Sequence, residues 1–541
     1  MKRDVSRLAE FAAVSAALAL VIGLVLHRQI VAPWSVPDLG DPLFSMWRLG
    51  WVAHQVSADP RQLFDANIFY PERASLTYSD SMILPGLMAA PLLWAGVHPV
   101  LAYNLLLISG FLLSSIAAYA LVRGLGLGRE AGWCAALIFG LYPSYRLDHF
   151  SHLELQMAQW IPLALLAIHL LIASRRAVYV PAVALLLAAQ SYSSMYYGVF
   201  LALYAAVFAG VLMLGRRAGW RTAASLTGAF VLAAALVLPL ARAYMASQPQ
   251  RGVRDERAVK EFSAESADYL KASRRLTLYG RIMPGPRHEE RQLFPGGVTL
   301  TLAAIGAFPP FGAVSLAAIA AGAVAFEGSL GFNGFVYPLL YQWIGPFRSL
   351  RVPARFGLFV GISLAVLAAV GTQRMFARVQ GGRARGLVLA AITAALIVEA
   401  WPSLRLEPSW REPPAIYATL HSGRGSVLAE FPVHGEPERF AENIPYMYFS
   451  MWHWTPMVNG YSGFQPASYA AFVRGAAGFP GGQSIDFLST LGVSHVGVHC
   501  ALWDPRVCAA ALDTLDRDRR VRRVAAAKWH GAQSVLYEMR R

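Results

Sequence analysis

Long uncharged runs dominate this sequence and limit what it can fold into. Residues 100–122, 157–173 and 197–214 contain no Asp, Glu, Lys or Arg. A helix needs about 20 apolar residues to cross a bilayer, and a water-soluble core has no place for several such helices. The hydrophobic share of 56%, against 15% charged residues, points the same way. The sequence therefore predicts an α-helical polytopic membrane protein. It excludes a cytosolic enzyme, a disordered chain and a disulfide scaffold.

The apolar runs and the basic loops between them predict a path through the membrane. The first run ends at His27-Arg28-Gln29 with no cleavage site, so we expect an uncleaved span and a cytoplasmic N-terminus. Together with the later runs this span gives about eleven crossings, with the proline-divided segment 82–97 at the interface. This path puts the short Arg-rich loops inside, including 374–385, and predicts a bacterial inner-membrane protein. The net charge of +15 then needs no nucleic-acid partner.

The polar segments predict the domain organisation. Segments 27–99, 145–157, 241–296 and 328–354 are expected to face the periplasm as loops of a transmembrane body over 1–400. Residues 401–541 are expected to form a small periplasmic α/β domain, with strands at 427–431 and 495–499 and helices at 466–475 and 509–515. Within it, Cys500 and Cys508 either form a local disulfide or remain two thiols.

Two carboxylates follow the first span. Asp38 and Asp41 stand three residues apart, and Asp41 is followed by Pro42. A carboxylate beside an apolar phase loses hydration, so its pKa rises towards that of a useful base. The same oxygens suit a hard divalent cation such as Mg²⁺ or Mn²⁺, with Asp41 as the ligand. The structural alternative is a helix start with Asp41 as the N-cap and Pro42 at the first position.

Polar and aromatic residues recur in the other outer segments. Interleaved aromatics over 64–71 suit either a membrane-interface belt or a sugar platform. Asp80 either contacts substrate or caps the short helix after it, and Tyr192 either contacts substrate or belongs to the aromatic belt. His152 and Gln156 are expected on one helix face, with His149 beside His152. Their spacing is not that of a zinc motif, so a polar helix end facing a wet cavity is favoured.

Three arginines stand at the outer mouth of a predicted span. They are Arg348, Arg351 and Arg355, at a place where the positive-inside rule disfavours cations. A guanidinium is a good planar partner for phosphate, so the head group of an anionic lipid is the natural ligand. The alternative is a set of ion pairs with acidic residues of the C-terminal domain.

Taken together, these features resemble the GT-C superfamily of integral membrane glycosyltransferases, which contains the protein mannosyltransferases and the RgtA-like enzymes. The resemblance rests on a first span followed by an outer loop with the acidic motif Gly40-Asp41-Pro42, and on a many-span body. The stretches that carry it are 40–51, 63–71, 101–104, 152–162, 292–296, 347–356 and 458–463.

The resemblance implies a reaction and roles for the residues above. A sugar would move, with inversion, from a polyprenyl-phosphate donor to a cell-envelope glycan, lipid or protein at the periplasmic face. The transferase would be a hexosyl- or pentosyltransferase. Asp41 would be the base or metal-linked acid group with Asp38 as its backup, and Arg351 and Arg355 would hold the lipid phosphate. A non-catalytic transporter or assembly factor for lipid-linked glycans is the alternative. The centres of the predicted spans contain almost no charged residues, however, which favours chemistry at the outer face.

Overall fold

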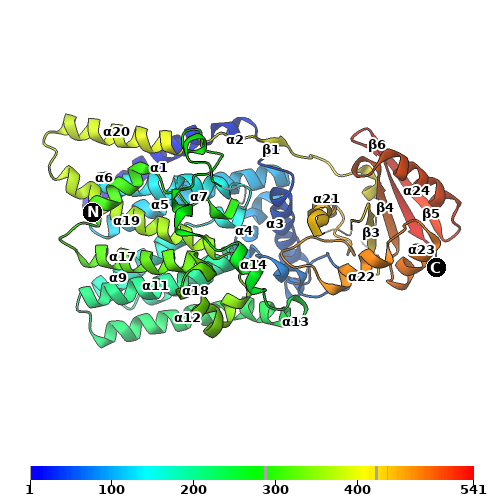
Figure 1. Ribbon diagram of the computed structural model, residues 1–541, viewed down its shortest axis with the longest axis horizontal. Helices are drawn as coiled ribbons and strands as arrows, with labels where there is room; N and C mark the ends of the chain where they lie inside the picture. Colours follow the sequence, from blue (N-terminus) through cyan, green and yellow to red (C-terminus); the bar gives the residue numbers. More distant parts are fainter. Residues whose placement is uncertain (1, 286–288, 421–424, 435–436, 541) are drawn as a thin grey trace. The chain divides into compact units, whose positions relative to one another are not determined.

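The computed structural model describes residues 2–285, 289–420, 425–434 and 437–540. Its internal contacts divide the chain into two compact units (Figure 1). Unit 1 comprises Met1–Pro37, Asn104–Pro239 and Val253–Leu406, and unit 2 comprises Asp38–Tyr103, Leu240–Gly252 and Glu407–Arg541. The first outer loop is thus grouped with the C-terminal region. The expected domains, 1–400 and 401–541, and their sides of a membrane stay predictions.

Unit 1 is built almost wholly from helices. Its longer helices are α1 (Lys2–Val25), α5 (Pro99–Gly124), α6 (Arg129–Leu141), α9 (Trp160–Ser174), α10 (Tyr179–Ser193), α11 (Met195–Gly215), α12 (Trp220–Ala246), α16 (Gly297–Gly306), α17 (Ala313–Ser329), α19 (Gly357–Phe376) and α20 (Gly382–Glu399). Its shorter elements are α2 (His27–Val31), β1 (Ser35–Val36), α7 (Pro143–Asp148), α8 (Leu153–Gln156), α14 (Glu256–Glu261), η3 (Ser266–Leu270), α15 (Tyr279–Ile282), η4 (Glu289–Arg291), η5 (Gly331–Asn333), α18 (Val336–Trp343), η6 (Gly345–Ser349) and η7 (Pro353–Phe356).

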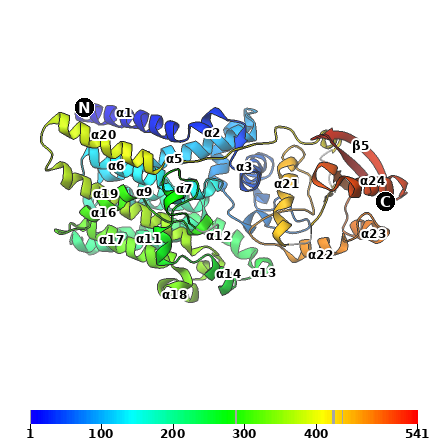
Figure 2. The same ribbon diagram turned by 45° about the horizontal axis from the view of Figure 1, so that its top comes forward.

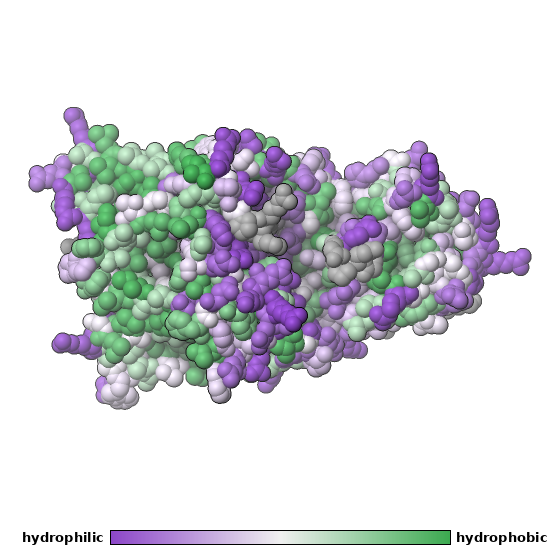
Figure 3. Space-filling view, viewed as in Figure 1, coloured by the Kyte–Doolittle hydropathy of each residue, from purple (hydrophilic) through white to green (hydrophobic). Residues whose placement is uncertain are grey.

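Several of these helices have the length and composition of membrane spans. In the part of the chain that the structure describes, six segments qualify: Arg7–Val25, Pro99–Gly124, Leu153–Ser174, Met195–Gly215, Trp220–Ala246 and Pro353–Phe376. Three further apolar helices are shorter: Ile83–Trp94, Gly297–Gly306 and Ala313–Ser329. The surface over the long helices of unit 1 is largely hydrophobic (Figure 3), with exposed side chains such as Leu214, Trp220 and Val231. A multi-pass membrane protein is therefore supported, while the count of about eleven crossings stays a prediction.

Helix α19 forms the centre of unit 1. It packs against α6, α16 and α17 (Figure 2). Most of its residues are buried. A Cβ atom at Gly306 on α16 would collide with the carbonyl oxygen of Leu367, and one at Gly371 would collide with that of Leu302. Small residues let helix backbones approach closely, as they do in membrane bundles. The two glycines therefore allow α16 and α19 to pack backbone to backbone.

Unit 2 combines helices with a sheet. Its helices are α3 (Asp41–Ala58), α4 (Ile83–Trp94), α13 (Gln248–Arg251), α21 (Ile444–Ser450), α22 (Ala467–Gly475), α23 (Gly482–Thr490) and α24 (Pro505–Arg517). Its 3-10 turns are η1 (Pro60–Gln62), η2 (Ser75–Tyr78), η8 (Ala415–Thr419), η9 (Pro437–Asn443) and η10 (Cys500–Leu502), and its strands are β2 (Glu407–Pro408), β3 (Leu428–Phe431), β4 (His495–His499), β5 (Val521–Trp529) and β6 (Ala532–Met539). Helices α4 and α21 both pack against α3.

The sheet of unit 2 has the order β3-β4-β6-β5. Strand β3 is parallel to β4, and β6 is antiparallel to both β4 and β5. Helix α24 begins at Pro505 because the Asp504 side chain accepts from two backbone N–H groups of its first turn. Cys500 and Cys508 form a disulfide that joins η10 to α24. Of the two states expected for these cysteines, the structure has the bonded one.

A buried polar cluster ties β3 to β4. The Glu430 carboxylate accepts from the Tyr417 hydroxyl at 2.7 Å and lies 2.9 Å from Nε2 of His499. Nδ1 of His499 lies 3.2 Å from the hydroxyl of Ser534 on β6. Gly497 stands opposite Glu430 in the register, where a Cβ would collide with the carboxylate. Only glycine leaves room for the Glu430 side chain to cross β4 and reach its partners.

Candidate functional site

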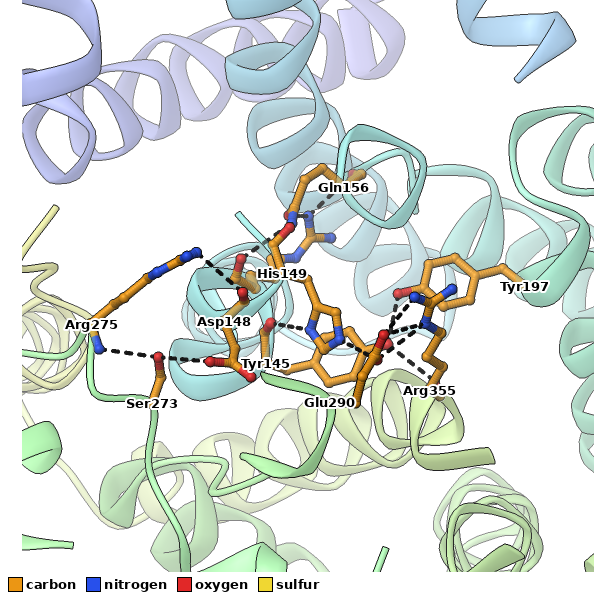
Figure 4. Close-up of polar contacts among 10 residues, drawn as sticks. Tyr145, Asp148, His149, Gln156, Tyr197, Ser273, Arg275, Glu290 and Arg355 are labelled. Atoms are coloured by element: carbon orange, nitrogen blue, oxygen red, sulfur yellow. Dashed lines mark hydrogen bonds and ion pairs between the residues drawn. The ribbon is translucent and has the colours of Figure 1, made fainter. Parts of the chain in front are cut away.

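A buried polar cluster lies where several loops of unit 1 meet (Figure 4). Glu290, in η4, is at its centre. Its Oε1 accepts a hydrogen bond of 2.6 Å from Arg355, whose Nε also lies 3.2 and 3.1 Å from the two carboxylate oxygens. Its Oε2 lies 2.7 Å from Nε2 of His149. One carboxylate thus joins the polar loop before α16, the turn before α19 and the loop after α7.

Each ring nitrogen of His149 contacts an oxygen atom. Nδ1 lies 2.8 Å from the carbonyl oxygen of Tyr145, while Nε2 faces Glu290. A carbonyl oxygen and an ionised carboxylate only accept hydrogen bonds. Both ring nitrogens of His149 therefore face groups that only accept hydrogen bonds. The Tyr145 ring lies 4.4 Å from the imidazole and covers it.

The ionised state of Glu290 follows from its partners. Burial alone would raise the pKa of Glu290, but the Arg355 guanidinium and the His149 ring hold it well below its usual range. A carboxylate with a bidentate guanidinium on one side and an imidazole on the other has little capacity left for substrate. Glu290 therefore fixes Arg355 and His149 in place and is not an open base.

The loop that carries His149 is locked by a second set of contacts. The fully buried Arg146 guanidinium donates to the backbone carbonyls of Phe139 and Gln156, at 3.1 and 3.2 Å. The Gln156 side-chain amide donates back to the carbonyls of Arg146 and His149, at 3.1 and 2.7 Å. These reciprocal bonds close the turn between α7 and α8. They position His149 with little freedom.

A further link ties this loop to the segment that follows η3. The Ser273 hydroxyl donates to the Asp148 carboxylate at 3.3 Å. The Arg275 guanidinium donates to the carbonyls of Leu147 and Asp148, at 3.1 and 3.2 Å. The cluster in Figure 4 is therefore held by hydrogen bonds on both sides of α7.

The three predicted arginines have different surroundings. Arg355 is 8% exposed, is paired with Glu290, and lies 4.7 Å from the ring centre of Tyr196. Arg348 is exposed and donates to the backbone carbonyls of Tyr341 and Gln342. The alternative prediction placed their partners in the C-terminal domain, whereas the carboxylate that holds Arg355 lies in the polar segment 241–296.

Arg351 is the remaining guanidinium of the set. It is half-buried, lies 4.6 Å from the ring centre of Phe262, and its backbone N–H donates to the Tyr196 hydroxyl at 2.9 Å. Within the described residues no carboxylate forms an ion pair with it. Of the three arginines, Arg351 is therefore the one best able to accept an anionic ligand.

The predicted acidic motif lies in unit 2, at the start of α3. The N-cap of α3 is Gly40, and Asp41 is the first helical residue, so the predicted cap is displaced by one position. A carboxylate in the first turn is still stabilised by the positive end of the helix dipole. The Asp38 side chain accepts from the Gly40 backbone N–H at 2.9 Å.

The structure offers no complete cage for the predicted metal. Over the ranges that the structure describes, no group of three His, Cys, Asp or Glu side chains comes together. Mg²⁺ is commonly held by one or two carboxylates together with substrate phosphates and water. Asp41 and Asp38 fit such a partial donor set, and a metal there stays a prediction.

The other predicted residues are dispersed over both units. Asp80, in unit 2, is 8% exposed, and its backbone carbonyl accepts from Arg48 at 3.0 Å. The N-cap of α4 is Met82, so Asp80 does not cap that helix as expected. In unit 1, Tyr192 donates to the carbonyl of Leu236 at 3.1 Å.

The predicted shared helix face of His149, His152 and Gln156 is wrong. Helix α7 ends at Asp148, α8 begins at Leu153, and the two histidines lie in the turn between them. Their rings are 5.9 Å apart and inclined by 64°. Gln156 closes this turn through backbone carbonyls, so the structure gives it a positioning role.

Comparison with known proteins gives a fold and no family. No family model matches the chain, and no curated protein matches it. Among solved structures, the chain is similar to the arabinofuranosyltransferase AftD from Mycobacteria, determined as an R1389S mutant by cryo-electron microscopy. The TM-score is 0.58 at 15% sequence identity, over 98% of this chain and 41% of the AftD chain. This chain thus spans less than half of that protein. Over the matched part, the two chains share a fold.

Proposed function

We propose that this chain is a membrane glycosyltransferase. It would move a sugar from a polyprenyl-phosphate donor to a cell-envelope acceptor at the periplasmic face of the inner membrane. The observation that carries the proposal is the fold likeness to a membrane arabinofuranosyltransferase over 98% of the chain. The disulfide between Cys500 and Cys508 supports an oxidising compartment for residues 407–541.

The proposed reaction requires a base and a site for the leaving phosphate. The acceptor hydroxyl oxygen attacks the anomeric carbon from the face opposite the donor phosphate. The bond between that carbon and the phosphate oxygen breaks, and polyprenyl phosphate leaves as an anion. Asp41 takes the hydroxyl proton, with Asp38 as its neighbour. A divalent cation, if bound by these carboxylates, would neutralise phosphate charge.

The buried cluster of unit 1 supports a phosphate-binding role for Arg351. Arg351 lies four residues before Arg355, which Glu290 anchors. The segment that carries Arg351 is therefore fixed at one end by a bidentate ion pair. We assign Arg351 to the donor phosphate, and Arg355, Glu290 and His149 to positioning it. Charge-assisted hydrogen bonds to phosphate contribute roughly 1.5–3 kcal/mol each.

Transfer of radiolabelled sugar from a polyprenyl-phosphate donor in proteoliposomes tests the proposal. The wild-type chain should transfer, and Asp41→Asn should abolish transfer while the protein still inserts and folds. Asp504→Asn is the matched control, because Asp504 only caps α24. Near-wild-type transfer by Asp41→Asn would remove Asp41 from catalysis. No transfer by the wild type with any donor would favour the non-catalytic transporter or assembly factor.

Donor dependence tests the role of Arg351 separately. Arg351→Ala should raise the KM for the donor about tenfold or more, and Arg351→Lys should restore little if the contact is bidentate. Arg348→Ala is the control, since the Arg348 guanidinium donates to backbone carbonyls of its own segment. An unchanged KM in Arg351→Ala would exclude this arginine from the donor site.

A further inference from the structure

A cavity of about 240 Å³ lies within unit 2. It is formed by the last turns of α3, the segment 62–72 and the turn after α21. Its walls carry three large aromatic side chains, two side-chain carboxamides of glutamine, one of asparagine and two carboxylates. The lining residues are Trp51, Gln55, Gln62, Asp65, Ala66, Asn67, Ile68, Tyr70, Glu72, Trp454 and Pro456.

The aromatic wall is rigid. The Trp454 ring stacks on His54 at 4.7 Å and 15°, and lies edge-on to Trp51 at 5.8 Å. The Trp51 indole N–H donates to the carbonyl of Leu63 at 2.8 Å. Trp454 has φ of 50°, a left-handed conformation that costs a bulky residue free energy. Such a conformation persists only where the surrounding structure holds the residue in place, and such residues cluster at functional sites.

The polar groups around the cavity are also fixed in place. The Asn67 carboxamide accepts from Trp47 at 3.1 Å and donates to the carbonyl of Thr455 at 3.4 Å. Asp65 accepts from the backbone N–H of Ala74 at 2.7 Å, and Glu72 accepts from the Tyr78 hydroxyl at 3.2 Å. These oxygens retain further accepting capacity. The described lining contains two carboxylates and no Lys or Arg, so its charge disfavours anions, although Arg73 lies 4.0 Å from the Asp65 carboxylate.

We propose that this cavity binds one ring of an uncharged carbohydrate. The C–H face of a sugar ring would pack on Trp454 and Trp51, and its hydroxyls would bond to the carboxamides and carboxylates. Pockets for drug-sized ligands measure about 300–1,000 Å³, so a smaller cavity fits a ligand of about one ring. Gln55 lies fourteen residues after Asp41 on α3, roughly 20 Å along the helix. The cavity is therefore a separate subsite from the proposed catalytic carboxylate.

Binding can be measured without any donor, so this proposal stands apart from transfer activity. The full chain in nanodiscs is titrated with methyl glycosides of neutral pentoses and hexoses, and binding is followed by saturation-transfer NMR. At least one neutral glycoside should bind, and methyl glucuronide should not. Polyprenyl phosphate without a sugar should leave the signal unchanged. Binding of the glucuronide alone, or displacement by the bare lipid, would overturn the assignment, as would the absence of any glycoside binding.

Variants locate the binding in this cavity. Trp454→Ala should weaken it about tenfold, through loss of the stacking surface. Gln62→Ala, on an exposed side chain that leaves the fold intact, should weaken it about three- to tenfold. Trp452→Ala and Gln465→Ala are the matched controls, because both side chains are exposed and neither lines the cavity. Unchanged binding in both Gln62→Ala and a folded Trp454→Ala would place the sugar elsewhere.

Discussion

Each unit of this protein buries a Glu–His pair, and the two pairs differ in their other partners. In unit 1, His149 lies between Glu290 and a backbone carbonyl, and Arg355 completes the set. In unit 2, His499 lies between Glu430 and the Ser534 hydroxyl. A carbonyl can only accept, whereas a hydroxyl can donate or accept. The ring nitrogens of His149 therefore face only acceptors, whereas one ring nitrogen of His499 faces a hydroxyl that can also donate.

This difference separates two uses of the same residue types. The unit 1 cluster places one carboxylate against a guanidinium and an imidazole, beside the segment that carries Arg351, so charge is essential to it. The unit 2 cluster closes the hydrogen bonds between β3, β4 and β6, and hydroxyl groups let it tolerate a change of charge. Replacing the buried glutamate by glutamine removes its charge and keeps its shape. This change should therefore destabilise unit 1 far more than unit 2.

The largest effect is expected for Glu290→Gln. The change leaves the Arg355 guanidinium buried without a counter-charge, which typically costs about 3–5 kcal/mol. Hydrogen exchange of peptides covering 145–156 and 351–360 should show a loss of protection of that size, with unit 2 unaffected. Glu261→Ala, an exposed carboxylate at the end of α14, is the control and should change little. Protection equal to that of the wild type in Glu290→Gln would contradict the prediction that the Glu290 charge is essential to the cluster.

Acidification should weaken unit 2 before it weakens the unit 1 cluster. Burial lowers the pKa of His453 from 6.5 to about 4, against the opposing charge of Glu430. The folded state thus holds the imidazole neutral. The contribution of the neutral His453 to the free energy of unfolding is fully present above about pH 6.5. It falls by about 3 kcal/mol as the pH drops to about 4. Glu290, whose pKa is lowered, contributes stability above about pH 4.5 that is lost only at lower pH.

Hydrogen exchange at several pH values, corrected for intrinsic rates, measures this order. Peptides covering 444–459 should lose protection between pH 6.5 and 4.5, while those around Glu290 keep it. His453→Gln should remove most of the loss in unit 2, since no imidazole is left to take up a proton. Simultaneous loss in both units, or a loss in unit 2 that survives His453→Gln, would contradict the assignment.

A smaller effect is expected for Glu430→Gln, the isosteric counterpart of Glu290→Gln. The new amide can still accept from the Tyr417 hydroxyl through its oxygen and can donate from its N–H to Nε2 of His499, so both hydrogen bonds are kept and only the charge is lost. We expect about 1–2 kcal/mol of destabilisation in unit 2, by hydrogen exchange of strands β3 and β4. A loss as large as that of Glu290→Gln would erase the distinction between the two clusters.

The sequence predicted the helical membrane architecture because the uncharged runs are long. It could not predict the number of crossings, since helices such as Gly297–Gly306 are too short for composition to decide. The strands β3 and β4 lie within one residue of the ranges expected at 427–431 and 495–499, because short apolar stretches between turn residues define them. Local pattern thus predicted elements better than it predicted their number.

The candidate site was predicted only in part. Arg355 was identified, but its partner Glu290 lies 65 residues away in the sequence. The second partner of Glu290, His149, lies 141 residues from it. Pairings over such separations leave no local pattern in one sequence. The helix expected through His149, His152 and Gln156 failed because side-chain bonds to backbone carbonyls close a turn there. The aromatic segment 64–71 did suggest a sugar platform, and part of it lines the cavity of unit 2.

The smallest effect tests the adaptable hydroxyl itself. Ser534→Ala removes the partner of Nδ1 of His499, which should cost about 1 kcal/mol in the protection of β4 and β6. In the Glu430→Gln background the same change should cost more. With an amide beside Nε2, the imidazole can move its proton to Nδ1 only if Ser534 can accept it. A double-mutant cycle should therefore give a coupling of at least about 0.5 kcal/mol. Strict additivity would show that Ser534 does not adapt to the charge on residue 430, and that the difference between the clusters has another origin.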